Sequence, residues 1–136
     1  MSITFGPGTY FIELNENDKP ILLTHSGIPL EDPEFRAVAG QESSFTFEIK
    51  AQDNERLFTF AELPITWTGR DGQPMKQPPS IYIVAVTITV NPPSPLRFEK
   101  RFPFDLRFDV GESSEGLWSA DGTKPLDPTI VENPPS

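Results

Sequence analysis

Apolar and polar residues alternate strictly in the most regular segments of this sequence. In residues 44–50, Phe45, Phe47 and Ile49 share one face of an extended chain, while polar residues occupy the other face. Residues 102–110 repeat the pattern, with charged residues between the apolar ones. A period of two is typical of a β-strand with one buried face, as found in antiparallel sheets that cover a core on one side.

Turn-forming residues separate these segments, and many of them belong to the 16 prolines of the 136-residue chain. The prolines interrupt most candidate helices, and no window of the sequence has the 3.6-residue apolar repeat of an amphipathic helix. We therefore predict an all-β fold, an antiparallel two-sheet β-sandwich that is immunoglobulin-like and has little or no helix. The expected strands cover residues 2–5, 9–14, 20–24, 35–39, 44–50, 57–61, 63–67, 81–90, 96–101, 102–110 and 129–131.

Two long segments predict further details of the sandwich. Residues 81–90 are apolar on both faces for most of their length, which favours a central strand. Residues 96–110 are too long for one flat strand, so we expect a bend or bulge near Lys100–Pro103 that carries the chain between the sheets. The predicted core lies on the apolar strand faces and includes Phe45, Phe47, Ile49, Val84, Val86, Ile88, Phe104, Leu106 and Phe108.

The chain has the length of a single domain, which we place at residues 1–131. Leu, Ile, Val and Phe make up roughly 27% of the chain, above the ~20% below which disorder is expected, despite the many prolines. Residues 132–136 contribute no expected core side chain, so we predict that they form a frayed tail.

The chain is acidic, with 20 Asp and Glu against 11 Lys and Arg and a formal net charge of −9. This charge repels nucleic-acid phosphates and anionic membranes, and the basic residues at 97–107 are interleaved with acids. No apolar run approaches the about 18 residues of a membrane span, and the N-terminus lacks the pattern of a signal peptide. We therefore expect no nucleic-acid partner, no membrane association and a cytoplasmic location.

Reactive and metal-binding side chains are scarce. Cysteine is absent and His25 is the single histidine, which excludes disulfides, Cys-ligated zinc and iron–sulfur clusters. His25 is interpreted as a surface turn residue. Glu31, Asp32 and Glu34 cluster at a proline turn, and residues 15–18 offer oxygens for calcium without the spacing of a calcium-binding loop. We expect no catalytic residue, no metal site and no cofactor, and calcium at residues 15–18 stays open.

Trp67 and Trp118 both lie next to turn-forming residues. An indole at the end of a sandwich either plugs the open core or stacks on a ligand such as a sugar. We favour the plug for each of them. They are nevertheless the ligand-binding candidates of this sequence.

Near the C-terminus, Asp127-Pro128 is followed by Glu132-Asn133-Pro134. This pattern resembles an uncharacterised bacterial group, the DP-EP family, over fewer than ten residues. That group has no assigned activity, so the resemblance implies no catalytic or binding residue.

Three functional hypotheses remain for a chain of this kind. The leading one is a non-catalytic structural or protein-interaction module, in which a partner protein or a second copy pairs with a strand edge. The alternative is a carbohydrate or small-ligand binding module that uses the loop tryptophans, and a hydrolase that uses carboxylates is third. Sandwich folds host all three classes, so the exposure of the tryptophans has to discriminate between the first two.

Overall fold

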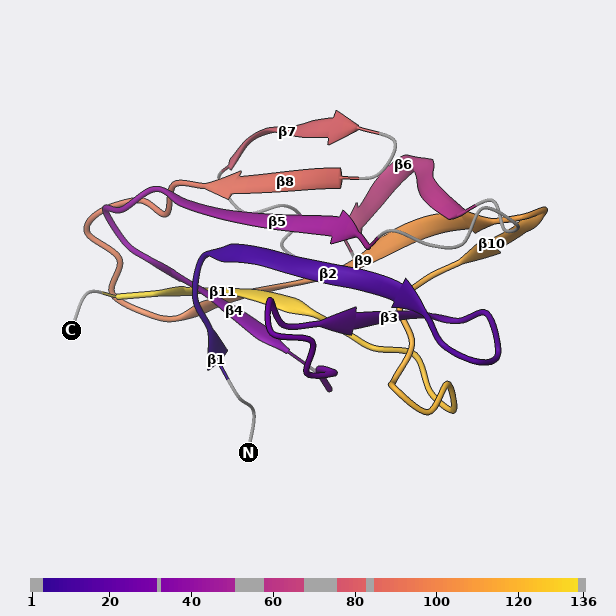
Figure 1. Ribbon diagram of the computed structural model, residues 1–136. Coiled ribbons are helices and arrows are strands. Elements are labelled where there is room, and N and C mark those ends of the chain that lie inside the picture. The colour runs from indigo at the N-terminus through magenta and orange to yellow at the C-terminus, as the bar shows by residue number, and fades with distance from the viewer. Residues whose placement is uncertain (1–3, 32, 51–57, 68–75, 83–84, 135–136) are drawn as a thin grey trace.

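The computed structural model describes residues 4–31, 33–50, 58–67, 76–82 and 85–134. Within these ranges the chain forms eleven strands and no helix, and the strands make two sheets that pack against each other (Figure 1). The predicted all-β sandwich is therefore confirmed. No helix in the described ranges is long and apolar enough to cross a membrane.

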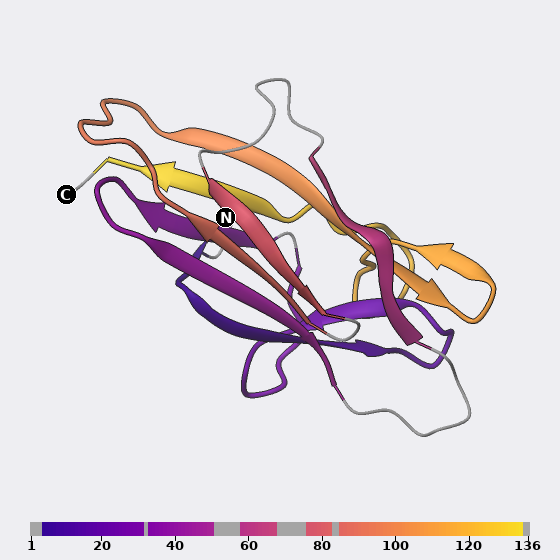
Figure 2. The same ribbon diagram turned by 90° about the horizontal axis from the view of Figure 1, so that it is seen from above.

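The first sheet has five strands in the order β3 (Pro20–Leu23), β2 (Gly8–Leu14), β5 (Ser43–Ile49), β8 (Ala85–Val90) and β7 (Lys76–Tyr82). The second sheet has β1 (Thr4–Phe5), β4 (Glu34–Val38), β11 (Thr129–Asn133) and β9 (Lys100–Val110) in that order. Two more strands, β6 (Phe58–Trp67) and β10 (Ser113–Glu115), pair with the second half of β9. Figure 2 shows β9 running from the side of β11 to the side of β6 and β10.

The expectation that all strands are antiparallel is wrong for three pairs. β1 and β4, β4 and β11, and β2 and β5 run parallel, so both sheets are mixed. The chain crosses to the second sheet at β4 and returns at β5, which lets β5 lie beside β2 in the same direction. Alternation of apolar and polar residues reports which face of a strand is buried and carries no information on the direction of its neighbour.

Several strand limits differ from the sequence prediction. The segment 81–90 divides between β7 and β8, and only β8 lies between two other strands as expected. β7 begins at residue 76 and contains two prolines, which an edge strand tolerates because its outer N–H groups need no partner. The sequence prediction also omitted β10, which is short and polar.

The predicted crossing between the sheets near Lys100–Pro103 is wrong, because β9 is one continuous strand of the second sheet that begins at Lys100. Residues 100–103 pair with β11, and residues 104–110 pair with β6. The N–H of Phe104 donates to the carbonyl of Pro128 at 3.0 Å, on the β11 side of the strand. Because successive backbone nitrogens point to opposite sides, the nitrogen of Pro103 points to the β6 side. The described pairs of β6 with β9 end at Trp67 and Phe104, so this nitrogen lies beyond them. The irregularity lies instead in β6, between Phe60 and Ile65.

The C-terminal boundary at residue 131 is also wrong, since β11 continues through Asn133. Glu132 and Asn133 pair with Ala37 and Val38 of β4, and Glu132 also pairs with Lys100 of β9. The strand is held on both sides by backbone pairing, which needs no apolar side chain. Judging the C-terminal residues by their apolar side chains alone therefore places the end of the last strand too early.

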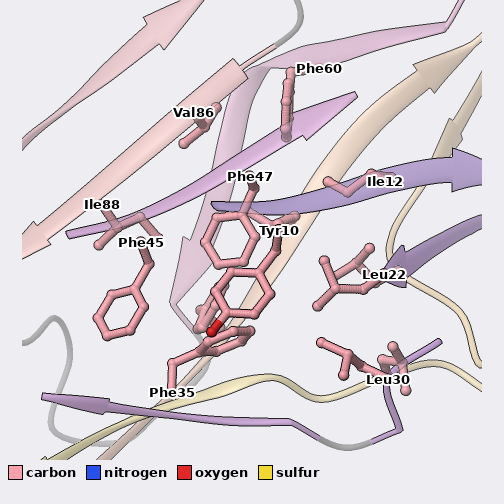
Figure 3. Packing of buried hydrophobic residues seen from close by; sticks show 14 of the residues in the cluster. Tyr10, Ile12, Leu22, Leu30, Phe35, Phe45, Phe47, Phe60, Val86 and Ile88 are labelled. Atoms are coloured by element: carbon pink, nitrogen blue, oxygen red, sulfur yellow. The ribbon is translucent and has the colours of Figure 1, made fainter. Parts of the chain in front are cut away.

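The core lies between the sheets and is rich in aromatic rings (Figure 3). Eight of the nine predicted core residues are buried, and the ninth, Val84, lies outside the described residues. Phe35 of β4 was not predicted, yet it is fully buried and joins the two sheets. Its ring centroid lies 4.9 Å from that of Tyr10 and 5.3 Å from that of Phe47, both in the first sheet, and 6.3 Å from Phe104 in the second.

We expect Phe35→Ala to lower the free energy of unfolding by about 3–5 kcal/mol, because it removes a buried ring from contact with both sheets. Phe98→Ala is the matched control, since Phe98 is 77% exposed, and it should change stability by less than about 0.5 kcal/mol. Urea unfolding followed by circular dichroism measures both. Similar losses in the two variants would contradict the central place given to Phe35.

One charged group lies in this core. Glu132 shares its side of β11 with the fully buried Ile130 and is itself only 1% exposed. One carboxylate oxygen, Oε2, has no hydrogen-bond partner among the described residues. Burial raises the pKa of the Glu132 carboxyl, and the charge of Lys100 opposes that rise without cancelling it.

The raised pKa of the Glu132 carboxyl makes the free energy of unfolding depend on pH. Because its pKa is higher in the folded than in the unfolded protein, its contribution is most favourable below the unfolded pKa and is lost as pH rises through the folded pKa. Glu132→Gln should therefore be more stable than the wild type at pH 7, and the difference should shrink towards pH 4. Thermal melts across this range test it, with the exposed Glu31→Gln as control. A Glu132→Gln difference that stays constant with pH would refute the assignment.

Candidate functional site

Trp67 ends β6 and faces the core. It pairs with Phe104 of β9, and the two ring centroids are 5.6 Å apart. Its partly buried side chain packs against the core cluster. This is the arrangement expected of a plug.

Trp118 lies in the segment 116–126, which closes one end of the sandwich between β10 and β11 (Figure 1). Leu117 and Leu126 of this segment are buried in the core, and the N–H of Leu126 donates to the carbonyl of Leu117 at 3.0 Å. The N–H of Trp118 donates to the carbonyl of Pro20 in β3 at 2.8 Å. The N–H of Leu117 reaches Asp105 Oδ1 of β9 at 3.4 Å. The backbone before Trp118 is thus attached to both sheets.

The indole of Trp118 is held by two charged side chains. Its Nε1–H donates to Glu115 Oε2 at 3.1 Å. Lys19 Nζ lies 4.7 Å from the centroid of the ring and 3.4 Å from Glu115 Oε1. A cation over an indole face and a charge-assisted hydrogen bond to its N–H both favour one orientation of the ring. Trp118 is therefore a fixed, partly exposed aromatic surface rather than a core plug.

Beside this ring is a hollow of about 250 Å³, which we call the Trp118 hollow. Its lining is Asp105, Arg107, Ser114, Glu115, Gly116, Leu117, Trp118 and Pro125. Trp118 lines the hollow, whereas Lys19, whose ammonium group lies over the indole ring, does not. An aromatic surface next to a few convergent polar groups is the usual composition of a small-ligand site.

Asp105 and Arg107 form the polar wall of the Trp118 hollow. They lie two residues apart on the face of β9 that points away from the core, and Arg107 Nη1 donates to Asp105 Oδ2 at 3.1 Å. Arg107 Nη2 also donates to Ser114 Oγ at 3.2 Å. The side chains of Asp105 and Arg107 remain 27% and 35% exposed, so a ligand in the hollow can reach both.

Gly116 lets the closing segment lie directly on this ion pair. A Cβ atom at residue 116 would be 2.5 Å from Asp105 Oδ2 and 2.8 Å from Arg107 Nη1. Both distances are shorter than real Cβ contacts, so any larger residue would have to displace the pair. The atoms that would shift are the carboxylate and guanidinium ends of flexible side chains.

In the calcium candidate at residues 15–18, the side-chain oxygen of Asn15 is used for local structure. Asn15 Oδ1 accepts hydrogen bonds from the backbone N–H of Asn17 at 2.8 Å and of Lys19 at 3.0 Å. In the neighbouring turn, hydrogen bonds from Thr123 and Ser119 lower the pKa of Asp121 to about 2. Among the residues described here, no group of three or more His, Cys, Asp or Glu side chains could hold a metal ion.

The other residues that the sequence singled out do not reach the Trp118 hollow. His25 is exposed, and its ring centroid lies 5.4 Å from that of Phe11. Glu31 is exposed, Asp32 lies outside the described residues, and Glu34 forms an ion pair with Arg101. Of the carboxylates of that turn, the structure thus describes Glu31 and Glu34, and Glu34 is engaged by Arg101.

A larger hollow of about 580 Å³ lies between residues 5–10 and the turn at 24–26. His25 lines it, no Asp, Glu, Lys or Arg side chain of the described residues does, and the Tyr10 hydroxyl donates to the carbonyl of Gly6. The Trp118 hollow is smaller but carries the denser set of polar groups. Sequence reasoning identified Trp118 as a ligand-binding candidate. It treated Asp105 and Arg107 as an ordinary charged strand surface and assigned no role to Lys19 or Glu115.

Comparison with known proteins adds no assignment: no protein-family model matches the chain, and no curated protein matches it significantly. The resemblance of the C-terminal residues to the DP-EP family therefore stays a prediction.

We expect Glu115→Ala to loosen the Trp118 indole, because it removes the acceptor of the indole N–H and the partner of Lys19. In a Trp67→Phe background, where Trp118 is the only tryptophan, emission should shift to longer wavelength and acrylamide should quench it more strongly. Glu112→Ala is the matched control, since Glu112 is exposed and lies in the turn just before β10. Equal quenching in the two variants would mean that Glu115 does not hold the ring.

Proposed function

We propose that this chain is a non-catalytic β-sandwich recognition module that binds a small polar ligand, foremost a carbohydrate, in the Trp118 hollow. The observation that carries this proposal is the fixed indole next to the Asp105–Arg107 pair. Sugars present apolar C–H faces and hydroxyl edges, so an aromatic surface flanked by charged hydrogen-bonding groups matches both parts. This favours the small-ligand alternative over the protein-interaction hypothesis that the sequence placed first.

The carboxylates of the hollow support binding rather than hydrolysis. Asp105 is engaged by Arg107 and by the N–H of Leu117, and Glu115 is engaged by Trp118 and Lys19. In a hydrolase with two catalytic carboxyl groups, the group that acts as general acid needs a raised pKa. The environments of the two carboxyl groups must therefore differ. Burial raises the pKa of the Glu132 carboxyl, and Glu132 does not line the hollow.

The second candidate function is recognition of a protein partner or a second copy along β6. Among the described strands β6 pairs only with β9, and Leu63 in its irregular part is 79% exposed. Pro64 and the exposed Glu62 flank this leucine and disfavour regular strand addition. We therefore rank this function second. Light scattering of the wild type and of Leu63→Asp tests it. If the chain assembles through the edge of β6, the particles of the variant should have a lower mass than those of the wild type.

A screen of small polar compounds by ¹H–¹⁵N NMR tests the leading proposal. Sugars, amino acids and nucleosides are added to ¹⁵N-labelled protein, and the two indole N–H signals are followed. We expect ligands to move the Trp118 signal and to leave the Trp67 signal in place, with no chemical change in the ligand. Trp118→Ala should abolish binding, while Trp67→Phe should preserve it. Ligands that shift only amides of β6 would favour the second candidate instead.

A further inference from the structure

We infer that the ligand of the Trp118 hollow is a neutral sugar unit with two adjacent hydroxyl groups, which the Asp105–Arg107 pair recognises. This inference rests on the proposed function and specifies its ligand. The sugar ring would lie against the part of the Trp118 indole that lines the hollow. The two hydroxyls would face the ion pair on β9.

The charges around the hollow favour a neutral ligand. Two cations, Lys19 and Arg107, face two anions, Asp105 and Glu115, and each is within 3.4 Å of an opposite charge. The set is balanced, so a charged ligand would have to compete with an existing ion pair. The formal net charge of −9 adds a further penalty for anions such as uronates or sugar phosphates.

The hydrogen-bonding capacity of the pair suits adjacent hydroxyls. Arg107 Nη1 and Asp105 Oδ2 place a donor and an acceptor 3.1 Å apart. A guanidinium group has five N–H donors and a carboxylate can accept about four hydrogen bonds, so both groups keep capacity after the contacts described. One hydroxyl of the ligand can donate to Asp105 while its neighbour accepts from Arg107. A sugar hydroxyl can both donate and accept a hydrogen bond, whereas a carboxylate only accepts and an ammonium group only donates.

The size of the hollow suits a ligand portion of about one ring. Its volume of about 250 Å³ is below the roughly 300–1,000 Å³ of sites that enclose drug-sized ligands. A single sugar unit, free or at the end of a chain, fits this description better than an enclosed oligosaccharide. A side chain at Gly116 would shift the carboxylate and guanidinium ends of the pair that faces the hydroxyls.

The test uses the full chain with Trp67→Phe, so that one indole signal reports on the hollow. The probes are the methyl glycosides of glucose, galactose and mannose, the matching uronates, glucosamine, and cyclohexanol beside cis- and trans-1,2-cyclohexanediol. We expect at least one neutral glycoside to move the Trp118 indole signal, with an affinity that salt changes little. The matching uronate should bind more weakly, and a cyclohexanediol should bind where cyclohexanol does not.

Variants then separate recognition from folding. Asp105→Asn should weaken the best glycoside about ten-fold or more, because a charged acceptor is lost. Arg107→Lys should weaken it as well, since a lysine lacks the planar fork of donors. Gly116→Ala should act like these two, while Asp109→Asn, an exposed residue of β9 outside the hollow, should have no effect. Thermal melts without ligand show whether each variant is folded.

The outcomes distinguish this inference from the proposed function. Tighter binding of the uronate or of glucosamine than of the neutral glycosides would overturn the inference and leave a Trp118 binding site standing. Unchanged glycoside affinity in Asp105→Asn and Arg107→Lys would overturn it as well. If no probe moves the Trp118 signal, while compounds of other classes do, the sugar assignment fails alone. If nothing moves it, both fail.

Discussion

The alternation of side chains along β9 determines both the core and the candidate site. Phe104, Leu106 and Phe108 point into the sandwich and are almost fully buried. Because successive side chains of a strand point to opposite faces, Asp105 and Arg107 must then point away from the core. A slip of one residue in the register of β9 would expose three large apolar side chains and bury the ion pair. The energy that packs the core therefore also fixes the wall of the Trp118 hollow.

A second constraint is the long-range pairing that brings the chain ends into one sheet. The C-terminal strand β11 lies between β4 and β9, and β4 carries Phe35 at the centre of the aromatic cluster. Phe35 contacts rings of both sheets, so the position of β4 couples the two layers. The closing segment 116–126 runs from β10 to β11, and its position depends on both strands. The site is thus built by segments distant in sequence on a scaffold held by the core.

The sequence was informative where one local pattern decides the structure. Phe45, Phe47 and Phe104 could be assigned to the core because period-two alternation identifies buried faces directly. Phe35 was missed because its strand is short and its neighbour Glu34 was considered for its charge. The parallel pairs could not be predicted, since strand direction depends on where the chain crosses between sheets. β7 was mostly missed because its prolines are acceptable only at an edge, which the sequence does not reveal.

The same distinction explains what was found of the site. Trp118 could be selected as one of two tryptophans, and the sequence could not tell it from Trp67. The difference is tertiary: Trp67 lies against Phe104, whereas Trp118 meets Lys19 from a turn about a hundred residues earlier. The Asp105–Arg107 pair looks like any charged strand surface until the closing segment is placed beside it. A glycine at position 116, followed by Leu117 and Trp118, was the available signal for a close approach.

The most direct test of this ligand site is a crystal structure of the protein grown with the tightest-binding neutral glycoside at saturating concentration. We predict density for one sugar ring against the Trp118 indole, with adjacent hydroxyls within hydrogen-bond distance of Asp105 and Arg107. Both side chains should keep the outward orientation imposed by the buried face of β9. Density for the sugar elsewhere on the sandwich, with the Trp118 hollow holding only solvent, would contradict it.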